Sequence, residues 1–167
     1  LADGAYDEVQ VEIADFTHTF DTSLGKSEGK GARATAKLRG VPSRIVQTVA
    51  GPVRVTTAFD LLMAQFGVPR GFSGAYPADY DDAAQPFTPA WQEQETGVDR
   101  NLVLRVAREW ADTAEKTKGK CLFITGSGVL HWYHGGPLIQ RAAAVMAVMT
   151  GCIGVNGGGL AHYVGQE

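Results

Sequence analysis

The chain has 167 residues, of which 44% are apolar and 20% are charged, and its formal net charge is −3. These proportions are typical of one soluble globular domain, and they exclude a disordered chain. The negative charge also excludes the clustered basic surface that non-specific nucleic-acid binding requires. No apolar stretch approaches the roughly 20 residues that span a bilayer, and no secretion signal opens the chain. Because the first residue is Leu1 rather than Met, we expect a piece of a longer protein.

Two segments of different character open the chain. Residues 1–40 are polar and rich in turn-forming residues, so we expect them to be irregular or extended. From residue 41 the composition changes, and the β-branched runs RIVQTVA and VRVTTA are separated by Gly51 and Pro52. This pattern predicts a β-hairpin.

A short helix and a long connection follow the hairpin. The apolar residues of the stretch from Phe59 to Phe66 predict a helix that ends at Gly67. Residues 70–95 contain several prolines, and we expect them to form a long irregular connection.

The clearest helix is predicted from Asp99 to Lys116. Its apolar residues recur on one side of the helix, and charged residues occupy the other side. Gly119 ends this helix, and the unbroken apolar run CLFIT at 121–125 then predicts a strand that is covered on both faces. The apolar stripe of the helix consists of Val103, Val106, Ala107, Trp110, Ala111 and Ala114.

A second helix is predicted after a glycine-rich turn. Pro137 suits its first turn, and residues 138–149 are apolar almost all round, so we expect burial on most sides. The run CIGV at 152–155 is a candidate for one more strand. Helix, strand, glycine turn and helix in succession predict an α/β fold with a parallel sheet over residues 41–167.

The stretch GSGVLHWYHGG, which follows CLFIT directly, carries the first candidate site. Glycine at 126 and 128 lets a backbone approach a pyrophosphate at the carboxyl end of a strand. However, His131 stands where a dinucleotide fingerprint needs its third glycine. A tight turn that needs positive φ is the structural alternative.

Histidines accompany both glycine clusters. His131 and His134 without a third ligand make a poor metal site, and they suit hydrogen bonding to an anion or heterocycle, or packing in the core. The closing GGGLAHYV is compatible with a linker, with a structural bend, or with bare backbone against a flat polar ligand beside His162. Cys121 and Cys152 are too few for a zinc or iron–sulfur site, and we expect both to be buried apolar residues.

These motifs together carry a resemblance to a known family. TPAWQEQETGVDRNLVLRVAREWADTAEKTKGK, GSGVLHWYHGG and GCIGVNGGGLAHYVGQE resemble consecutive segments of the catalytic alpha subunit of respiratory nitrate reductase, in the DMSO-reductase family of molybdopterin oxidoreductases. The resemblance covers roughly residues 41–167, and the first forty residues resemble the family loosely. Two departures are Leu130, where the family usually has Asn, and Leu160, where it usually has Trp.

The resemblance implies a role in holding a cofactor. It implies that residues 41–167 are a Rossmann-like portion of a larger subunit that grips a bis-molybdopterin guanine dinucleotide, with His131 nearest the metal end. Neither a catalytic residue nor a metal ligand is implied here, because the [4Fe-4S] cluster motif and the molybdenum-ligating Asp of the family lie upstream. The isolated chain is therefore expected to be inactive. The implied cofactor contacts are Gly126, Ser127, Gly128, His131, Gly157, Gly158, Gly159, His162 and Gly165.

The resemblance also implies partners and a place in the cell. The rest of the alpha subunit, an iron–sulfur beta subunit and a membrane gamma subunit would accompany this soluble piece at the cytoplasmic face of the membrane. Quinol-linked reduction of nitrate to nitrite would be the parent activity. The alternatives are a free-standing dinucleotide-binding module, an interaction domain with structural glycines only, or a piece of a related nitrite oxidoreductase, chlorate reductase or selenate reductase.

Overall fold

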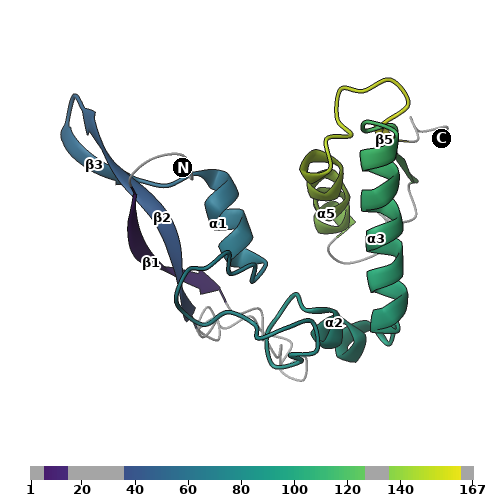
Figure 1. Cartoon of the computed structure of the whole chain (residues 1–167), viewed down its shortest axis with the longest axis horizontal. Helices are drawn as coiled ribbons and strands as arrows, with labels where there is room; N and C mark the ends of the chain where they lie inside the picture. Colours follow the sequence, from purple (N-terminus) through teal and green to yellow (C-terminus); the bar gives the residue numbers. More distant parts are fainter. Residues whose placement is uncertain (1–5, 15–35, 127–135, 163–167) are drawn as a thin grey trace, which may run out of the picture. The chain divides into compact units, whose positions relative to one another are not determined.

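The computed structural model describes residues 6–14, 36–126 and 136–162 of the chain (Figure 1). It divides into two compact units, Leu1–Arg100 and Asn101–Glu167, and each is described by itself. The first unit contains β1 (Asp7–Ala14), β2 (Ala36–Thr48), β3 (Gly51–Val55), α1 (Ala58–Gln65) and α2 (Pro89–Thr96). Helix α3 (Arg100–Lys116) leads into the second unit, which contains β4 (Leu122–Thr125), α5 (Gly136–Met149) and β5 (Gly159–His162).

The long strand β2 pairs with two neighbours in turn. Residues 36–43 pair antiparallel with β1, and residues 44–48 pair antiparallel with β3. The predicted hairpin is therefore confirmed. Its turn is closed by Thr48, whose Oγ1 donates to the carbonyl oxygen of Gly51 at 2.8 Å, while Gly51 adopts a positive φ of 106°.

The described part of the first forty residues is extended, which is one of the two forms expected for it. Strand β1 and the start of β2 lie there. In DEVQVEIA the apolar residues occur at every second position, which is a strand pattern that the high charge concealed. Val9, Val11 and Ile13 pack in a core with Val41 and Ala64. The predicted division of the chain after residue 40, with residues 41–167 as the portion that holds the cofactor, stays a prediction.

Helix α1 confirms the predicted short helix. Thr57 precedes it, and its side chain accepts from the backbone N–H of Asp60 at 3.0 Å, which caps the first turn. Burial acts to raise the pKa of Asp60, but hydrogen bonds from Thr57 and Arg70 and the charge of Arg70 outweigh it and lower that pKa. Gly67 has a positive φ of 76° just after the helix, as expected for a helix end.

The connection after α1 is not irregular throughout. Helix α2 occupies its last part, beginning at Pro89, after Thr88 whose Oγ1 accepts from the N–H of Trp91 at 3.1 Å. A proline in the first turn of a helix loses no hydrogen bond, so it marks a helix start rather than a break. The expectation of an irregular segment over 70–95 is therefore wrong for residues 89–95.

Arg39 joins three parts of the first unit. Its side chain is fully buried, and its guanidinium lies 5.3 Å from the centre of the Tyr76 ring. It donates to the carbonyl oxygens of Ala75 at 2.8 Å and of Ala64 at 2.5 Å. A further bond reaches Gln85 Oε1 at 3.3 Å. One cation on β2 therefore binds both the end of α1 and the connection that follows it.

We predict that Arg39→Lys lowers the free energy of unfolding by about 3 kcal/mol, because each buried acceptor left without a donor costs ~1–3 kcal/mol. An ammonium group cannot reproduce the several directed bonds of the guanidinium. The measurement is urea unfolding followed by circular dichroism. Arg54→Lys is the matched control, since Arg54 makes an exposed ion pair with Asp7 that should contribute less than about 1 kcal/mol. Equal losses in the two variants would contradict the role of Arg39.

In the second unit, β4 and β5 form a parallel pair. Leu122 is opposite Gly159, and Thr125 is opposite His162. The α/β class with parallel strands is therefore confirmed, while the Rossmann-like arrangement stays a prediction. Residues 152–155 form turns rather than the suggested strand, since Gly154 has a positive φ of 79°. The strand forms seven residues later, at β5.

Small residues make up the core of the second unit. Ala114 of α3, Ala147 of α5 and Cys152 are buried against one another, with Trp110 and Cys121 packed beside them. Cys152 is buried as predicted, and Cys121 is half-buried. Burial raises the pKa of the Cys121 thiol.

The expected coverage of both faces of β4 and of most sides of α5 is wrong for the described residues of this unit. On β4, Leu122 and Ile124 are 44% and 77% exposed, so one face of the strand is uncovered. On α5, Leu138 and Val148 are exposed as well. No element among the described residues covers these side chains, although their composition is that of buried strand and helix.

Candidate cofactor-binding site

The structure describes part of the predicted site. Gly126 and the run Gly157–Gly159 lie among the described residues, as does the backbone of His162 in β5. The rest of the predicted set lies outside the described residues, namely Ser127, Gly128, His131 and Gly165.

The carboxyl ends of β4 and β5 bring two distant parts of the sequence together. Because the strands are parallel and Thr125 is opposite His162, both strands end at the same edge of the sheet. Gly126 follows β4 directly at this edge and is exposed. Ligands of open α/β sheets bind outside the carboxyl ends of the strands. The strand pairing thus places Gly126 beside the backbone of His162 where such a ligand would lie.

The backbone of Gly126 has no structural need for glycine within the described part of the chain. Its φ lies outside the positive range, and no described atom comes within 4 Å of the place where a Cβ would stand. The alternative of a tight turn with positive φ therefore does not explain this glycine. Open space above bare backbone is compatible with close approach of a ligand.

Helix α5 links the two strands and packs against both of them. Since β4 and β5 are parallel, the connection must return from the carboxyl edge to the amino edge, so α5 begins nearer the carboxyl edge. Its first N–H groups and the positive end of its dipole therefore favour an anion on that side.

The glycine run 157–159 lies at the opposite end of β5. Gly159 is opposite Leu122 at the start of both strands, and its N–H donates to the carbonyl oxygen of Cys121 at 3.0 Å. A Cβ on Gly158 would stand 2.1 Å from the carbonyl oxygen of Gly119 and 2.7 Å from that of Cys152. Gly158 is therefore required by packing, in agreement with the structural-bend interpretation. Contact of this run with a cofactor stays a prediction.

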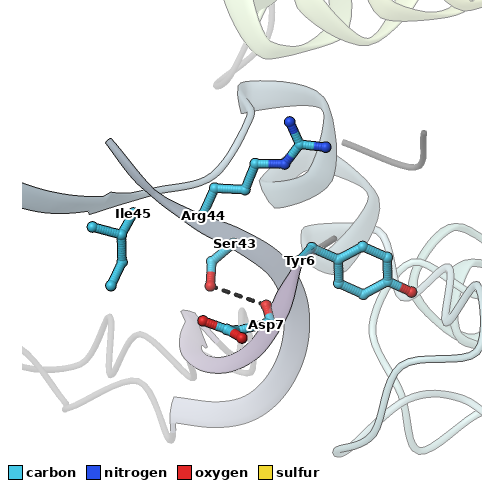
Figure 2. A pocket seen from close by; sticks show the side chains of 5 residues that line it. All are labelled: Tyr6, Asp7, Ser43, Arg44 and Ile45. Atoms are coloured by element: carbon cyan, nitrogen blue, oxygen red, sulfur yellow. Dashed lines mark hydrogen bonds between the residues drawn. The ribbon is translucent and has the colours of Figure 1, made fainter. Parts of the chain in front are cut away.

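A surface hollow of about 290 Å³ lies in the first unit, and its lining includes no residue of the predicted set (Figure 2). It is lined by Tyr6, Asp7, Ser43, Arg44 and Ile45. Ser43 Oγ donates to the carbonyl oxygen of Asp7 at 3.0 Å, and Arg44 and Ile45 leave opposite sides of β2. The side chains do not converge on one point, so this hollow is a weak candidate for a ligand.

Two further properties concern the described residues only. They contain no group of three or more histidine, cysteine, aspartate or glutamate side chains that could hold a metal ion. Nor do they include a helix of the length and apolar character that a membrane crossing needs.

Comparison with known proteins identifies the family. No family model matches the chain. Over 129 residues, or 77% of its length, it is 43% identical to the nitrate reductase alpha chain of Bacillus subtilis (strain 168). Over 150 residues, or 89% of its length, it is 45% identical to the nitrate reductase alpha subunit of Mycobacterium tuberculosis (strain ATCC 25618 / H37Rv). The chain belongs to the nitrate reductase alpha chain family.

The match covers a small part of these alpha chains. It includes 10% of the Bacillus subtilis protein and 11% of the Mycobacterium tuberculosis protein, so the chain spans about a tenth of the length of these relatives. A more distant relative is the perchlorate reductase subunit alpha of Dechloromonas aromatica (strain RCB). It is 39% identical over 79 residues, which are 47% of this chain and 8% of that protein.

The packing role of Gly158 in this alpha chain segment can be tested by stability. We predict that Gly158→Ala lowers the free energy of unfolding by about 1–3 kcal/mol, because the added methyl group overlaps two carbonyl oxygens. Gly126→Ala is the matched control and should change it by less than about 0.5 kcal/mol, since no described atom stands near its Cβ position. Thermal unfolding by calorimetry measures both. An unaffected Gly158→Ala variant would contradict the close approach of the three backbone segments.

Proposed function

We propose that the chain is part of the catalytic alpha subunit of a respiratory nitrate reductase, which reduces nitrate to nitrite, and that it holds part of the molybdopterin cofactor. The observation that carries the proposal is the parallel pairing of Thr125 with His162. This pairing brings Gly126 and the backbone of His162 to the carboxyl edge of the sheet, where ligands of open α/β sheets bind. The identity to nitrate reductase alpha chains over most of the chain supports the choice of family.

The described part of this edge fits a dinucleotide cofactor. Bare, exposed backbone at Gly126 leaves room for a pyrophosphate, and the start of α5 adds a favourable dipole on the same side. The proposed cofactor is bis-molybdopterin guanine dinucleotide, which would supply the oxygen-atom transfer when it is bound. The residues proposed to hold and orient it are Gly126, Ser127, Gly128, His131, Gly157, Gly158, Gly159, His162 and Gly165.

Within this set, we propose that the two edges of the sheet have different roles. Gly126 and the backbone of His162 lie at the carboxyl edge. We assign His131 to the end of the cofactor that carries the metal. The run Gly157–Gly159 lies at the amino edge, and Gly158 already has a packing role there. We therefore expect the carboxyl edge to contribute the stronger cofactor contacts.

The remaining parts of the activity are assigned to other parts of the enzyme. A [4Fe-4S] cluster and the molybdenum ligand would come from the rest of the alpha subunit. An iron–sulfur beta subunit and a membrane gamma subunit would deliver electrons from quinol and hold the complex at the cytoplasmic face of the membrane. This chain would orient the cofactor and exclude water from it.

We predict that the isolated chain produces no nitrite from nitrate with a reduced dye as electron donor, because the metal ligand and the cluster motif are supplied elsewhere. Colorimetric detection of nitrite measures the outcome, and the full-length alpha subunit with its partners serves as positive control. Turnover by the isolated chain would refute the proposal that it is one part of a larger catalytic unit.

The cofactor contact at Gly126 has its own test. In the full-length alpha subunit, Gly126→Val should lower the content of molybdopterin guanine dinucleotide at least fivefold, because the side chain would occupy the space proposed for the pyrophosphate. Chromatography of the released, oxidised cofactor measures it. Lys120→Val, an exposed position two residues before the start of the same strand, is the control and should retain full cofactor content. Normal cofactor content in Gly126→Val would exclude this contact.

A second candidate substrate follows from the match to a perchlorate reductase subunit. The same alpha subunit could act on chlorate or selenate, or in the direction of nitrite oxidation. Nitrate is preferred because the nitrate reductase alpha chains match more of the chain at higher identity. Comparing kcat/KM of the complete complex for nitrate, chlorate and selenate separates these activities.

A free-standing nucleotide-binding module would instead show saturable binding of a guanine nucleotide or NAD by the isolated chain in calorimetry.

A further inference from the structure

The outer part of the hairpin extends beyond the sheet core. Because β1 pairs only with residues 36–43, residues 44–55 form a two-stranded antiparallel segment, here named the β2–β3 ribbon. Figure 1 shows this ribbon continuing past the end of β1. The core residues Ile13 and Val41 lie in the other part of the sheet, where they pack with Ala64 of α1. A two-stranded segment without a core of its own is marginally stable in water.

The ribbon exposes an unusual number of β-branched side chains. Every residue from Ile45 to Ala50 and from Pro52 to Val55 is exposed. Clustered apolar side chains on a surface indicate an interaction site more often than scattered ones do. The exposed apolar residues are Ile45, Val46, Val49, Val53 and Val55.

Strand register sorts these side chains onto two faces. Val46 is directly opposite Val53, and Arg44 is opposite Val55, so the three valines share one side, here named the valine face. Val46, Val53 and Val55 are 44%, 43% and 38% exposed. The valine face thus carries three adjacent valines, with Arg44 beside them at the base of the ribbon.

The opposite face of the ribbon contacts the rest of the first unit. Arg54, which is opposite Ile45, donates to Ser43 Oγ at 2.8 Å and pairs with Asp7 at 3.1 Å. Figure 2 shows Ser43 directed toward Asp7 and Arg44 directed away from it. These contacts hold the base of the ribbon and leave the valine face accessible among the described residues.

The ribbon is suited to contact through its face rather than its edge. Pro52 has no N–H to extend a ladder, and a proline in a short edge strand opposes the addition of another strand. Arg44 shares the valine face, opposite Val55, and residues 44–55 contain no acidic residue. A complementary surface would therefore be apolar with acidic residues at its rim.

We propose that the valine face is a contact with another part of the same alpha subunit polypeptide, outside these 167 residues, whose surface is apolar and acidic at its rim. The relatives are about ten times as long as the matched segment, so most of such a polypeptide lies outside it. The ribbon would anchor this segment within the subunit by burying three valines. The proposal rests on the family assignment and not on the proposed cofactor contacts.

Hydrogen exchange of residues 44–55 tests the proposal directly. We expect at least tenfold slower exchange in the purified full-length alpha subunit than in the 167-residue chain at the same concentration. Equal exchange rates would overturn the proposal. So would protection of the 167-residue chain that increases with its concentration, which indicates a second copy as occupant, or protection that requires the beta or gamma subunit.

Two sets of variants of the full-length alpha subunit locate the contact on one face. Val46→Lys together with Val53→Lys should lower the unfolding temperature of the full-length subunit by several degrees, because two charges enter an apolar contact. Gln47→Lys adds a charge to the opposite face and should leave it unchanged. Equal effects of both, or no effect of the double variant, would refute the assignment to the valine face.

A labelling experiment covers the case in which the lysine variants do not fold. Val53→Cys changes size little, and its reaction with a maleimide is followed by mass spectrometry of the peptide that contains residue 53. The labelling rate should be at least tenfold lower in the full-length subunit than in the 167-residue chain. Equal rates would overturn the proposal.

Discussion

The close approach of three backbone segments at Gly158 sets the geometry of the second unit. The carbonyl oxygens of Gly119 and Cys152 occupy the space where a side chain at position 158 would lie. This approach fixes where β5 begins, and β5 then pairs with β4 from Leu122 to Thr125. Gly126 and His162 reach the same edge of the sheet as a consequence. The candidate site therefore depends on a packing constraint at the opposite end of the strands.

The glycines of this chain thus serve different physical purposes. Gly158 is required because no side chain fits, and Gly51 and Gly67 are required because their φ values are positive. Gly126 meets neither condition among the described residues. For Gly126 we therefore propose another physical reason, namely a ligand that approaches its bare backbone.

Both units have surfaces that suit a larger protein. In the first unit, the buried guanidinium of Arg39 donates to carbonyl oxygens of α1 and of the connection that follows it, and so joins both to β2. The β2–β3 ribbon of the same unit has no core of its own. In the second, Leu122 and Ile124 are exposed on a strand whose composition is that of a buried one. Membership in a family of much longer alpha chains gives these exposed apolar groups a common explanation.

The sequence alone determined the elements whose signals are local. The hairpin follows from β-branched runs around Gly51, α3 from its apolar stripe, and the α/β class from the order of helix, strand and helix. The motifs also sufficed to identify the family. Only the tertiary structure decided that GLAH rather than CIGV forms the second parallel strand, and that Gly158 lies far from Gly126 along the sheet. Register and backbone packing depend on contacts between residues distant in sequence, which no local pattern encodes.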